Sequence, residues 1–244
     1  MPTLLEKIEA NAAERLPLPP NRQPSQELAR YKNFLKVESH RLKMLHRAGA
    51  GGREICVARA GMMDVLLRHI LEAVQQAAEV ESTTPVPRFV LVAIGGYGRG
   101  ELNPQIDIDI MFLHSGDTVS TARGKPHPYL SALTDGLLYT LWDIGLKVGH
   151  SVRTIDDCVK VANGDMQSKT SLIEARFIVG EKDLFERMQT VVLARCVRGF
   201  EGEYIAARLA DQEARRAKFG NSATMQEPNI KNGCGGLRDY QNLL

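Results

Sequence analysis

The sequence predicts an α+β fold, in the broad α/β class, with a small mixed sheet flanked by N- and C-terminal helices. An apolar run at 89–94 reads as a buried strand and stops at a glycine pair, Gly95-Gly96. A second apolar run follows and carries two acids, Asp107 and Asp109. Apolar residues recur at helical spacing on both sides of this region, so each of those helices buries one face.

Strands are expected at 89–94, from Ile106 through the Asp-containing run, and at 146–154. Ser25 is expected to cap a helix that runs to about His46, and a second long helix places Met62, Leu66 and Ile70 on one face. Further helices are expected at 130–144, 156–163, 171–179, 183–198 and 201–218, followed by a loop at 220–236.

Proline-rich stretches divide the chain, because proline and the residue before it favour extended backbone. We expect an N-terminal segment and linker at 1–24, a helical region at 25–85, a core at 86–180, and a helical region with a glycine-rich loop at 181–244. The apolar finish at Leu243-Leu244 favours a polypeptide that continues into further domains.

Composition excludes several classes of protein. The 31 basic and 29 acidic residues leave a net charge of +2, which gives no reason to expect a nucleic-acid or membrane partner. The four cysteines form no Cys-x-x-Cys pair and are expected to be reduced thiols. No apolar run reaches 18 residues, so we expect a soluble cytoplasmic protein.

The acids of the second strand indicate a metal site. Alternate residues of a strand share a face, so Asp107 and Asp109 would lie roughly 6.5–7 Å apart on one side of the sheet. Buried carboxylates at that spacing repel each other unless a cation lies between them. Mg²⁺, held by one or two carboxylates and by substrate phosphates, fits this pattern best.

The glycine pair indicates the substrate. Gly95 and Gly96 allow a sharp turn into a helix whose first amides would face phosphates, and Arg99 would add a charge-assisted contact. Together with the two acids, this predicts nucleotidyl transfer from a nucleoside triphosphate. The alternative is a tight glycine turn with acids that only cap a loop, but Ile106, Ile108 and Ile110 alternate with the acids and favour the strand.

The motif Gly-Gly-Tyr-Gly-Arg-Gly-Glu-Leu-x-Pro at 95–104, followed by Asp-Ile-Asp, resembles the polymerase-β-type nucleotidyltransferase superfamily. Within it, the chain is most similar to the PII uridylyltransferase/uridylyl-removing family. Three further stretches carry that similarity, at 148–154, 170–176 and 227–239, so the resemblance covers roughly residues 30–244. It implies a polymerase-β-like core, UTP and Mg²⁺ as substrate and cofactor, and a tyrosine of the PII signalling protein as acceptor.

The chain departs from the family pattern at several positions. Ile106 stands where the family usually has Ser, and Asn232 and Cys234 stand where Glu and Pro are common. Longer family members continue into a metal-dependent hydrolase and two glutamine-sensing domains, which are absent from this sequence. We therefore expect transfer, without removal or sensing.

Three assignments stay open. Glu174 is the candidate third metal-binding acid, but Ser171-x-x-Glu174 also matches a capping box that would open a helix. Lys231 and Arg238 of the glycine-rich loop are candidate nucleotide ligands. In the alternative interpretation, Gly235-Gly236 starts a helix and Arg238 pairs locally with Asp239. The competing functions are transfer of another nucleotide such as AMP, transfer to another protein or a small molecule, and a degenerate regulatory domain that only binds nucleotide.

Overall fold

The computed structural model describes residues 3–19, 22–79, 87–116 and 127–243. Its sheet consists of strands β1 (Phe89–Ala93), β2 (Ile108–His114), β3 (Val148–Arg153) and β4 (Arg176–Gly180), in the order β3-β2-β1-β4. β1 runs antiparallel to β2 and β4, whereas β2 and β3 are parallel. The mixed sheet and the α+β class predicted from the sequence are therefore confirmed.

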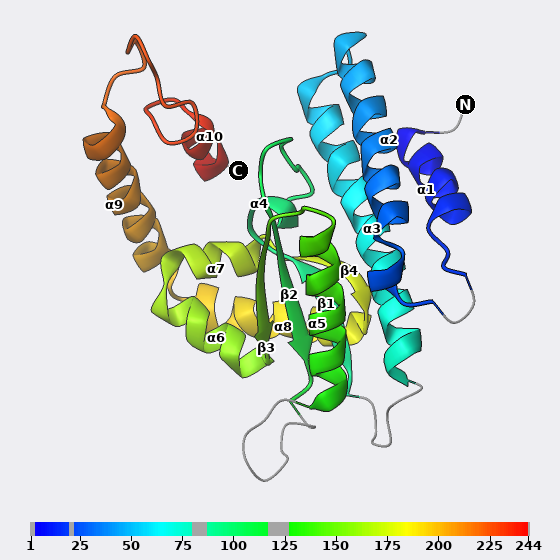
Figure 1. Ribbon diagram of the computed structural model, residues 1–244. Helices are drawn as coiled ribbons and strands as arrows, with labels where there is room; N and C mark the ends of the chain where they lie inside the picture. Colours follow the sequence, from blue (N-terminus) through cyan, green and yellow to red (C-terminus); the bar gives the residue numbers. More distant parts are fainter. Residues whose placement is uncertain (1–2, 20–21, 80–86, 117–126, 244) are drawn as a thin grey trace.

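Helices surround this sheet on both faces and extend from it at both ends of the chain (Figure 1). The described α-helices are α1 (Leu4–Arg15), α2 (Leu28–Arg47), α3 (Gly52–Glu79), α4 (Gly95–Gly98), α5 (Pro128–Asp143), α6 (Ile155–Gly164), α7 (Met166–Ile173), α8 (Lys182–Val192), α9 (Glu201–Phe219) and α10 (Leu237–Leu243). A short 3-10 turn, Pro24–Gln26, precedes α2, and a π-helical turn, Leu193–Val197, extends α8. None of the described helices has the length and apolar character that a membrane span requires.

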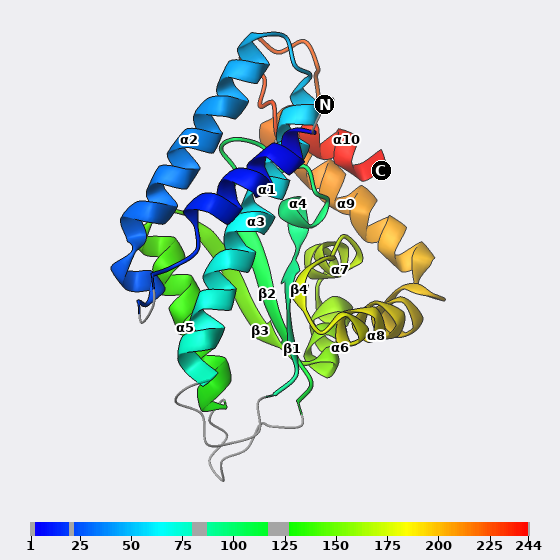
Figure 2. The same ribbon diagram turned by 90° about the vertical axis from the view of Figure 1, so that its right-hand side faces the viewer.

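The two faces of the sheet belong to two separate cores, because side chains of a strand alternate between faces. Ile108, Ile110 and Phe112 of β2 are buried with residues of α3 and α5. Met111 and Leu113 are buried on the opposite face with residues of α6 and α8. Figure 2 shows the two helical layers on either side of the sheet. Asp109 belongs to the second face, so the predicted alternation of isoleucines and acids is confirmed within β2.

The C-terminal helices form an arm that stands away from the sheet. α9 leaves the body beside α7, and the chain then returns so that α10 lies on the side facing α4 (Figure 1). None of the side chains of α9 is buried, so the arm contributes little to either core.

Several expected elements differ from the structure. The helix predicted at 171–179 is wrong: α7 ends at Ile173, and residues 176–180 form β4, which pairs with β1. The periodicity of a run as short as Arg-Phe-Ile-Val-Gly is compatible with both a helix and a strand. This segment becomes a strand because it pairs with the open edge of β1. Ser25 lies in the 3-10 turn and does not cap α2, whose cap position is Glu27.

The expected loop at 220–236 is present, and α10 follows it, as expected if Gly235-Gly236 starts a helix. The boundary expected between the helical region and the core, at 85–86, lies outside the described residues, as do Pro20 and most of the segment between β2 and α5.

Candidate active site

The glycine turn after β1 places backbone close to two polar side chains. Gly95 has φ +58°, a conformation that favours glycine. A Cβ atom at Gly95 would lie 3.3 Å from Ser171 Oγ and 3.4 Å from Asp109 Oδ2. The helix α4 that follows is only four residues long, so the helix expected to face phosphates is a single turn. Its first amides nevertheless have no acceptor within the helix.

A cluster beneath the turn fixes its position. The Tyr97 hydroxyl donates to the carboxylate of Asp64 on α3, and Arg176 of β4 donates to the same carboxylate at 2.6 and 3.0 Å. The Arg176 guanidinium lies 5.2 Å from the centre of the Tyr97 ring. Burial, followed by the charge of Asp64, raises the pKa of Tyr97 well above its usual value. Asp64 thus ties together α3, α4 and β4.

Asp109 is the second residue of β2, and its carboxylate lies over β3. Its register partner is Gly149, where a Cβ atom would lie 2.2 Å from Asp109 Oδ1. The carboxylate therefore occupies space that exists only because Gly149 has no side chain. Burial raises the pKa of Asp109, the charge of Asp107 raises it further, and Lys231 lowers it.

Asp107 lies just before β2 and is exposed. The expected strand therefore begins one residue later than the first acid, at Ile108, and Asp107 does not line the cavity that Asp109 lines. Its charge still acts on Asp109, which places the two carboxylates in one electrostatic site.

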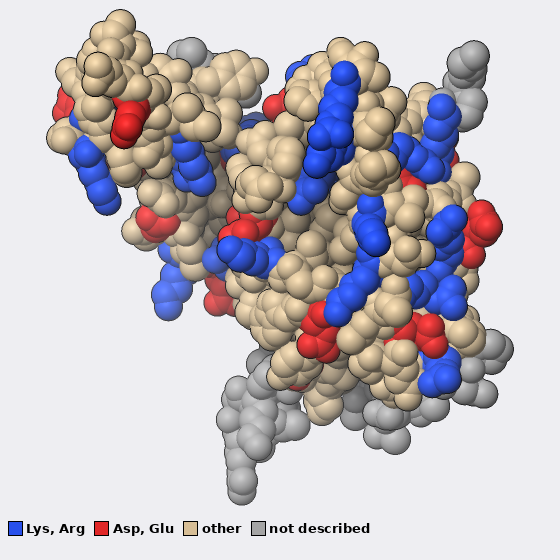
Figure 3. Space-filling model, turned by 45° about the horizontal axis from the view of Figure 1, so that its top comes forward, with Lys and Arg blue, Asp and Glu red and all other residues tan. Residues whose placement is uncertain are grey.

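Two adjoining cavities form a cleft between the sheet and the C-terminal arm. The smaller, of about 270 Å³, is lined by Gly95, Gly96 and Asp109 on the core side and by Lys231 and Arg238 on the arm. The larger, of about 690 Å³, lies between α7, α9 and α10. Both cavities share the residues Arg99, Thr170, Glu174, Arg208, Gln241 and Asn242. In the space-filling view, the surface is hollowed between the arm and the body, with acidic and basic side chains close together beside the hollow (Figure 3).

The cations of the smaller cavity differ in how they are paired. Arg99 donates to Glu174 at 2.6 Å, and Arg208 donates to Asn242. The side chains of Lys231 and Arg238 form no ion pair with any residue that the structure describes. These two charges remain available to an anionic ligand facing Asp109.

Glu174 is not part of a capping box, because α7 ends where that motif would start a helix. Asp165 caps α7 by accepting from the Ser168 amide at 2.7 Å, and Glu174 is the residue at the other end. The Glu174 carboxylate forms an ion pair with Arg99. The side chain of Glu174 is 19% exposed and that of Arg99 is 20% exposed. Glu174 therefore lies in the cleft, but as the partner of a cation.

The C-terminal end of the glycine-rich loop agrees with one of the two interpretations of its sequence, the start of a helix. Gly235-Gly236 directly precede α10, so this pair does start a helix. The local pairing of Arg238 with Asp239 is wrong, because Asp239 accepts from Arg215 of α9 at 3.1 Å and from the Gly235 amide at 3.0 Å. These contacts hold α10 against α9 and leave Arg238 in the cleft.

The structure thus brings seven predicted residues into the smaller cavity: Gly95, Gly96, Arg99, Asp109, Glu174, Lys231 and Arg238. Sequence reasoning missed further lining residues on α7, α9 and α10, namely Gln167, Thr170, Ser171, Arg208, Gln241 and Asn242. The polar face of α7 carried a signal, because Gln167, Ser171 and Glu174 recur at helical spacing.

The donor set suits a hard divalent cation. Asp109 and Asp107 carry carboxylate oxygens, and a cation bound beside them would oppose the burial and the charge of Asp107 that raise the pKa of Asp109. Mg²⁺ commonly takes one or two carboxylates and completes its ligands with water and phosphate. No described group of three His, Cys, Asp or Glu side chains is placed to hold a metal ion. Within this electrostatic site, Asp107 and Asp109 are the carboxylates that are not neutralised by an ion pair with a described residue.

Gly149→Ala is expected to weaken Mg²⁺-dependent nucleotide binding by roughly tenfold or more, because its methyl group displaces the Asp109 carboxylate, and small displacements of reacting groups are costly. Titration with nucleotide and Mg²⁺ measures the effect. Gly164→Ala is the matched control, since a Cβ atom there meets no atom within 4 Å. Equal affinities in the two variants would show that the position of this carboxylate does not matter.

Fold and site together define a class of protein: an α+β domain with one acid on a strand and a second just before it, a glycine turn and a cation-lined cleft. Residues 203–244, a range that includes most of α9, the loop after it and α10, match the family described as GlnD PII-uridylyltransferase. The chain is 37% identical over 202 residues to a bifunctional uridylyltransferase/uridylyl-removing enzyme of Erythrobacter litoralis, covering 82% of the chain and 21% of that protein. It is 33% identical over 205 residues to one of Rhodospirillum rubrum, covering 84% of the chain and 21% of that protein.

The chain is therefore related in sequence to the uridylyltransferase/uridylyl-removing family, and the resemblance inferred from its motifs is confirmed. It spans about a fifth of the length of these curated relatives.

Proposed function

We propose that this chain is a nucleotidyltransferase that transfers UMP from UTP to a tyrosine hydroxyl of a PII-type signalling protein. One observation carries the proposal: the Asp109 carboxylate lies between Gly95 and Gly149, in a cavity that is also lined by Lys231 and Arg238, two cations without an ion pair to any described residue. A cleft with the Asp109 carboxylate on one wall and these two cations on the other suits a metal-bound triphosphate. The relatives, whose names include uridylyltransferase, support UTP as the nucleotide.

The proposed role of each residue of the cleft follows from its charge and its position. Lys231 and Arg238 bind phosphate oxygens and orient the triphosphate along the cleft. Gly95 and Gly96 let that triphosphate approach the backbone of the turn. Asp107 and Asp109 would hold Mg²⁺, which when bound supplies positive charge that stabilises the phosphate oxygens during transfer. The nucleophile is the hydroxyl of the acceptor, so the chain itself needs no nucleophilic side chain.

The test is transfer of label from α-labelled UTP, with ATP in parallel, to a purified PII-type protein in the presence of Mg²⁺. The proposal expects protein-bound label from UTP. Label from ATP alone would assign the chain to adenylyl transfer instead.

A regulatory domain that binds nucleotide without transfer is the second candidate. It is favoured by one observation, that the described residues offer two metal-binding acids while Glu174, the third candidate, is held by Arg99. This alternative expects Mg²⁺-dependent nucleotide binding with no label on the acceptor from either nucleotide.

The raised pKa of Asp109 gives an expected pH dependence. A metal needs the ionised carboxylate, so Mg²⁺-dependent UTP binding is expected to fall as the pH drops through the pKa of Asp109, which lies above the value of about 4 for an ordinary aspartate. A titration of binding affinity against pH at fixed Mg²⁺ measures this acid limb. In the Asp109→Asn variant the limb should disappear; a limb at the same pH in that variant would assign it to another group.

A further inference from the structure

The larger cavity of about 690 Å³ has the size and lining of a nucleoside site. Clefts that bind small molecules commonly enclose about 300–1,000 Å³ and combine apolar walls with a few polar groups. Here Ile205 and Leu209 of α9 are 57% and 55% exposed, and Ile173 of α7 is 45% exposed, although all three are apolar. The cavity adjoins the smaller cavity that contains Asp109, and the two share six lining residues.

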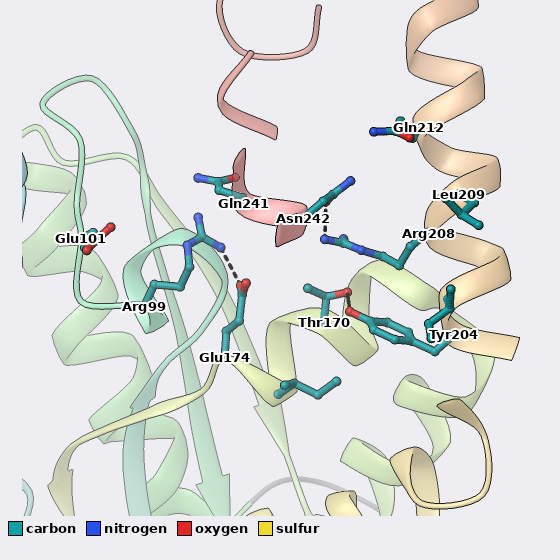
Figure 4. Close-up of a pocket in the computed structure, with 12 residues that line it drawn as sticks. Arg99, Glu101, Thr170, Glu174, Tyr204, Arg208, Leu209, Gln212, Gln241 and Asn242 are labelled. Atoms are coloured by element: carbon teal, nitrogen blue, oxygen red, sulfur yellow. Dashed lines mark hydrogen bonds and ion pairs between the residues drawn. The ribbon is translucent and has the colours of Figure 1, made fainter. Parts of the chain in front are cut away.

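Two planar groups are held rigidly in this cavity. The Tyr204 hydroxyl and Thr170 Oγ1 are hydrogen-bonded at 2.7 Å, which fixes the ring against α7. The Arg208 guanidinium lies 5.9 Å from the centre of the Tyr204 ring. Figure 4 shows both side chains projecting from α9 toward α7 and α10. Aromatic rings and guanidinium planes are the groups on which proteins stack bases.

The amides of the cavity present defined hydrogen-bonding groups. Arg208 Nη2 donates to Asn242 Oδ1, which leaves the Asn242 Nδ2 amide as a donor directed away from Arg208 (Figure 4). Gln212 Nε2 donates to Asp239 Oδ1 at 3.4 Å, which leaves Gln212 Oε1 as an acceptor. The hydrogen-bond network thus assigns one donor and one acceptor to the same cavity.

We propose that the larger cavity binds the uridine part of UTP and that Asn242 reads the base. Asn242 Nδ2 donates to the uracil O4 carbonyl, Gln212 Oε1 accepts from N3–H, and Tyr204 with Arg208 provides the stacking surface. Cytosine and adenine carry an amino donor where uracil carries O4, and that donor would face the Asn242 donor. This inference rests on the proposed function and adds to it the residues that select the nucleotide.

The test compares the affinities of UTP and CTP for the chain in the presence of Mg²⁺. Asn242→Asp keeps the shape of the side chain and the acceptor for Arg208, but replaces the donor with an acceptor. Its preference for UTP over CTP is expected to fall about tenfold or more, because a site built to hydrogen-bond a substrate group discriminates strongly against its absence. Asn221→Asp is the matched control, since Asn221 is exposed and lines neither cavity.

A second variant separates stacking from base reading. Tyr204→Leu is expected to weaken UTP and CTP by the same factor, because stacking does not depend on the base. If UTP binds and Asn242→Asp leaves the UTP-to-CTP ratio unchanged, the assignment of base reading is overturned while the proposed function stands. If Tyr204→Leu leaves both affinities unchanged, the cavity is not the nucleoside site. If the unaltered chain binds neither nucleotide, the proposed function itself fails.

Discussion

Asp109→Asn is expected to reduce transfer of UMP by about 10³-fold or more, while the folded chain becomes no less stable. The amide is nearly the same size as the carboxylate but carries no charge, and charge stabilisation by a bound metal ion is worth several kcal/mol of the barrier, with each 1.36 kcal/mol equal to a factor of ten. The measurement is the initial rate of label transfer from UTP at saturating Mg²⁺. Asp107→Asn tests the second acid in the same assay.

The expected free energy of unfolding of the Asp109→Asn variant follows from the raised pKa of Asp109. A carboxyl whose pKa is higher in the folded than in the unfolded state is penalised when ionised, so its contribution to stability decreases as the pH rises through that pKa. Asn removes the penalty, and the free energy of unfolding at neutral pH should stay equal or rise in the absence of Mg²⁺. Asp143→Asn, at the exposed end of α5, is the control for loss of an acidic charge. A variant that is inactive because it is unfolded would contradict this account.

Asp64→Ala is expected to lower the free energy of unfolding by about 3 kcal/mol, because it leaves the partly buried Arg176 guanidinium and the Tyr97 hydroxyl without their shared acceptor. For a chain of this size, that corresponds to a decrease in Tm of about 10 °C. Denaturant unfolding and thermal melting of the purified chain measure both quantities.

Asp135→Ala is the matched control for this substitution. Asp135 is exposed on α5 and forms no ion pair with the described residues, so its loss should change stability by no more than about 0.5 kcal/mol. Similar melting temperatures for Asp64→Ala and Asp135→Ala would show that the cluster does not hold the glycine turn in place.

The local parts of the candidate site were predictable from the sequence. The glycine turn at Gly95 and the alternation of Ile108, Asp109 and Ile110 are encoded within a few neighbouring residues, and backbone geometry translates that order directly into position. The buried stripes of α3 and α5 are also visible as helical periodicity.

The parts that depend on distant contacts were not predictable. The role of Gly149 follows from the parallel register that places it beside Asp109, and no local pattern fixes that register. Glu174 accepts a hydrogen bond from Arg99, which lies 75 residues earlier in the sequence. Because of this distant contact, Glu174 neutralises a cation, and no local pattern in the sequence indicates that role. The helix start at Gly235-Gly236 stayed one of two interpretations, because α10 is a seven-residue helix held by Arg215 of α9, and isolated helices this short are not stable by their own propensity.

The central claim is that the cleft lined by Asp109, together with the neighbouring Asp107, binds UTP and Mg²⁺. Calorimetric titration of UTP into the chain, with and without Mg²⁺, tests it without requiring an acceptor protein. The account predicts binding that requires Mg²⁺ in the unaltered chain and is lost in the Asp107→Asn, Asp109→Asn double variant. Equal UTP affinity in the double variant, or affinity that does not change when Mg²⁺ is removed, would contradict it.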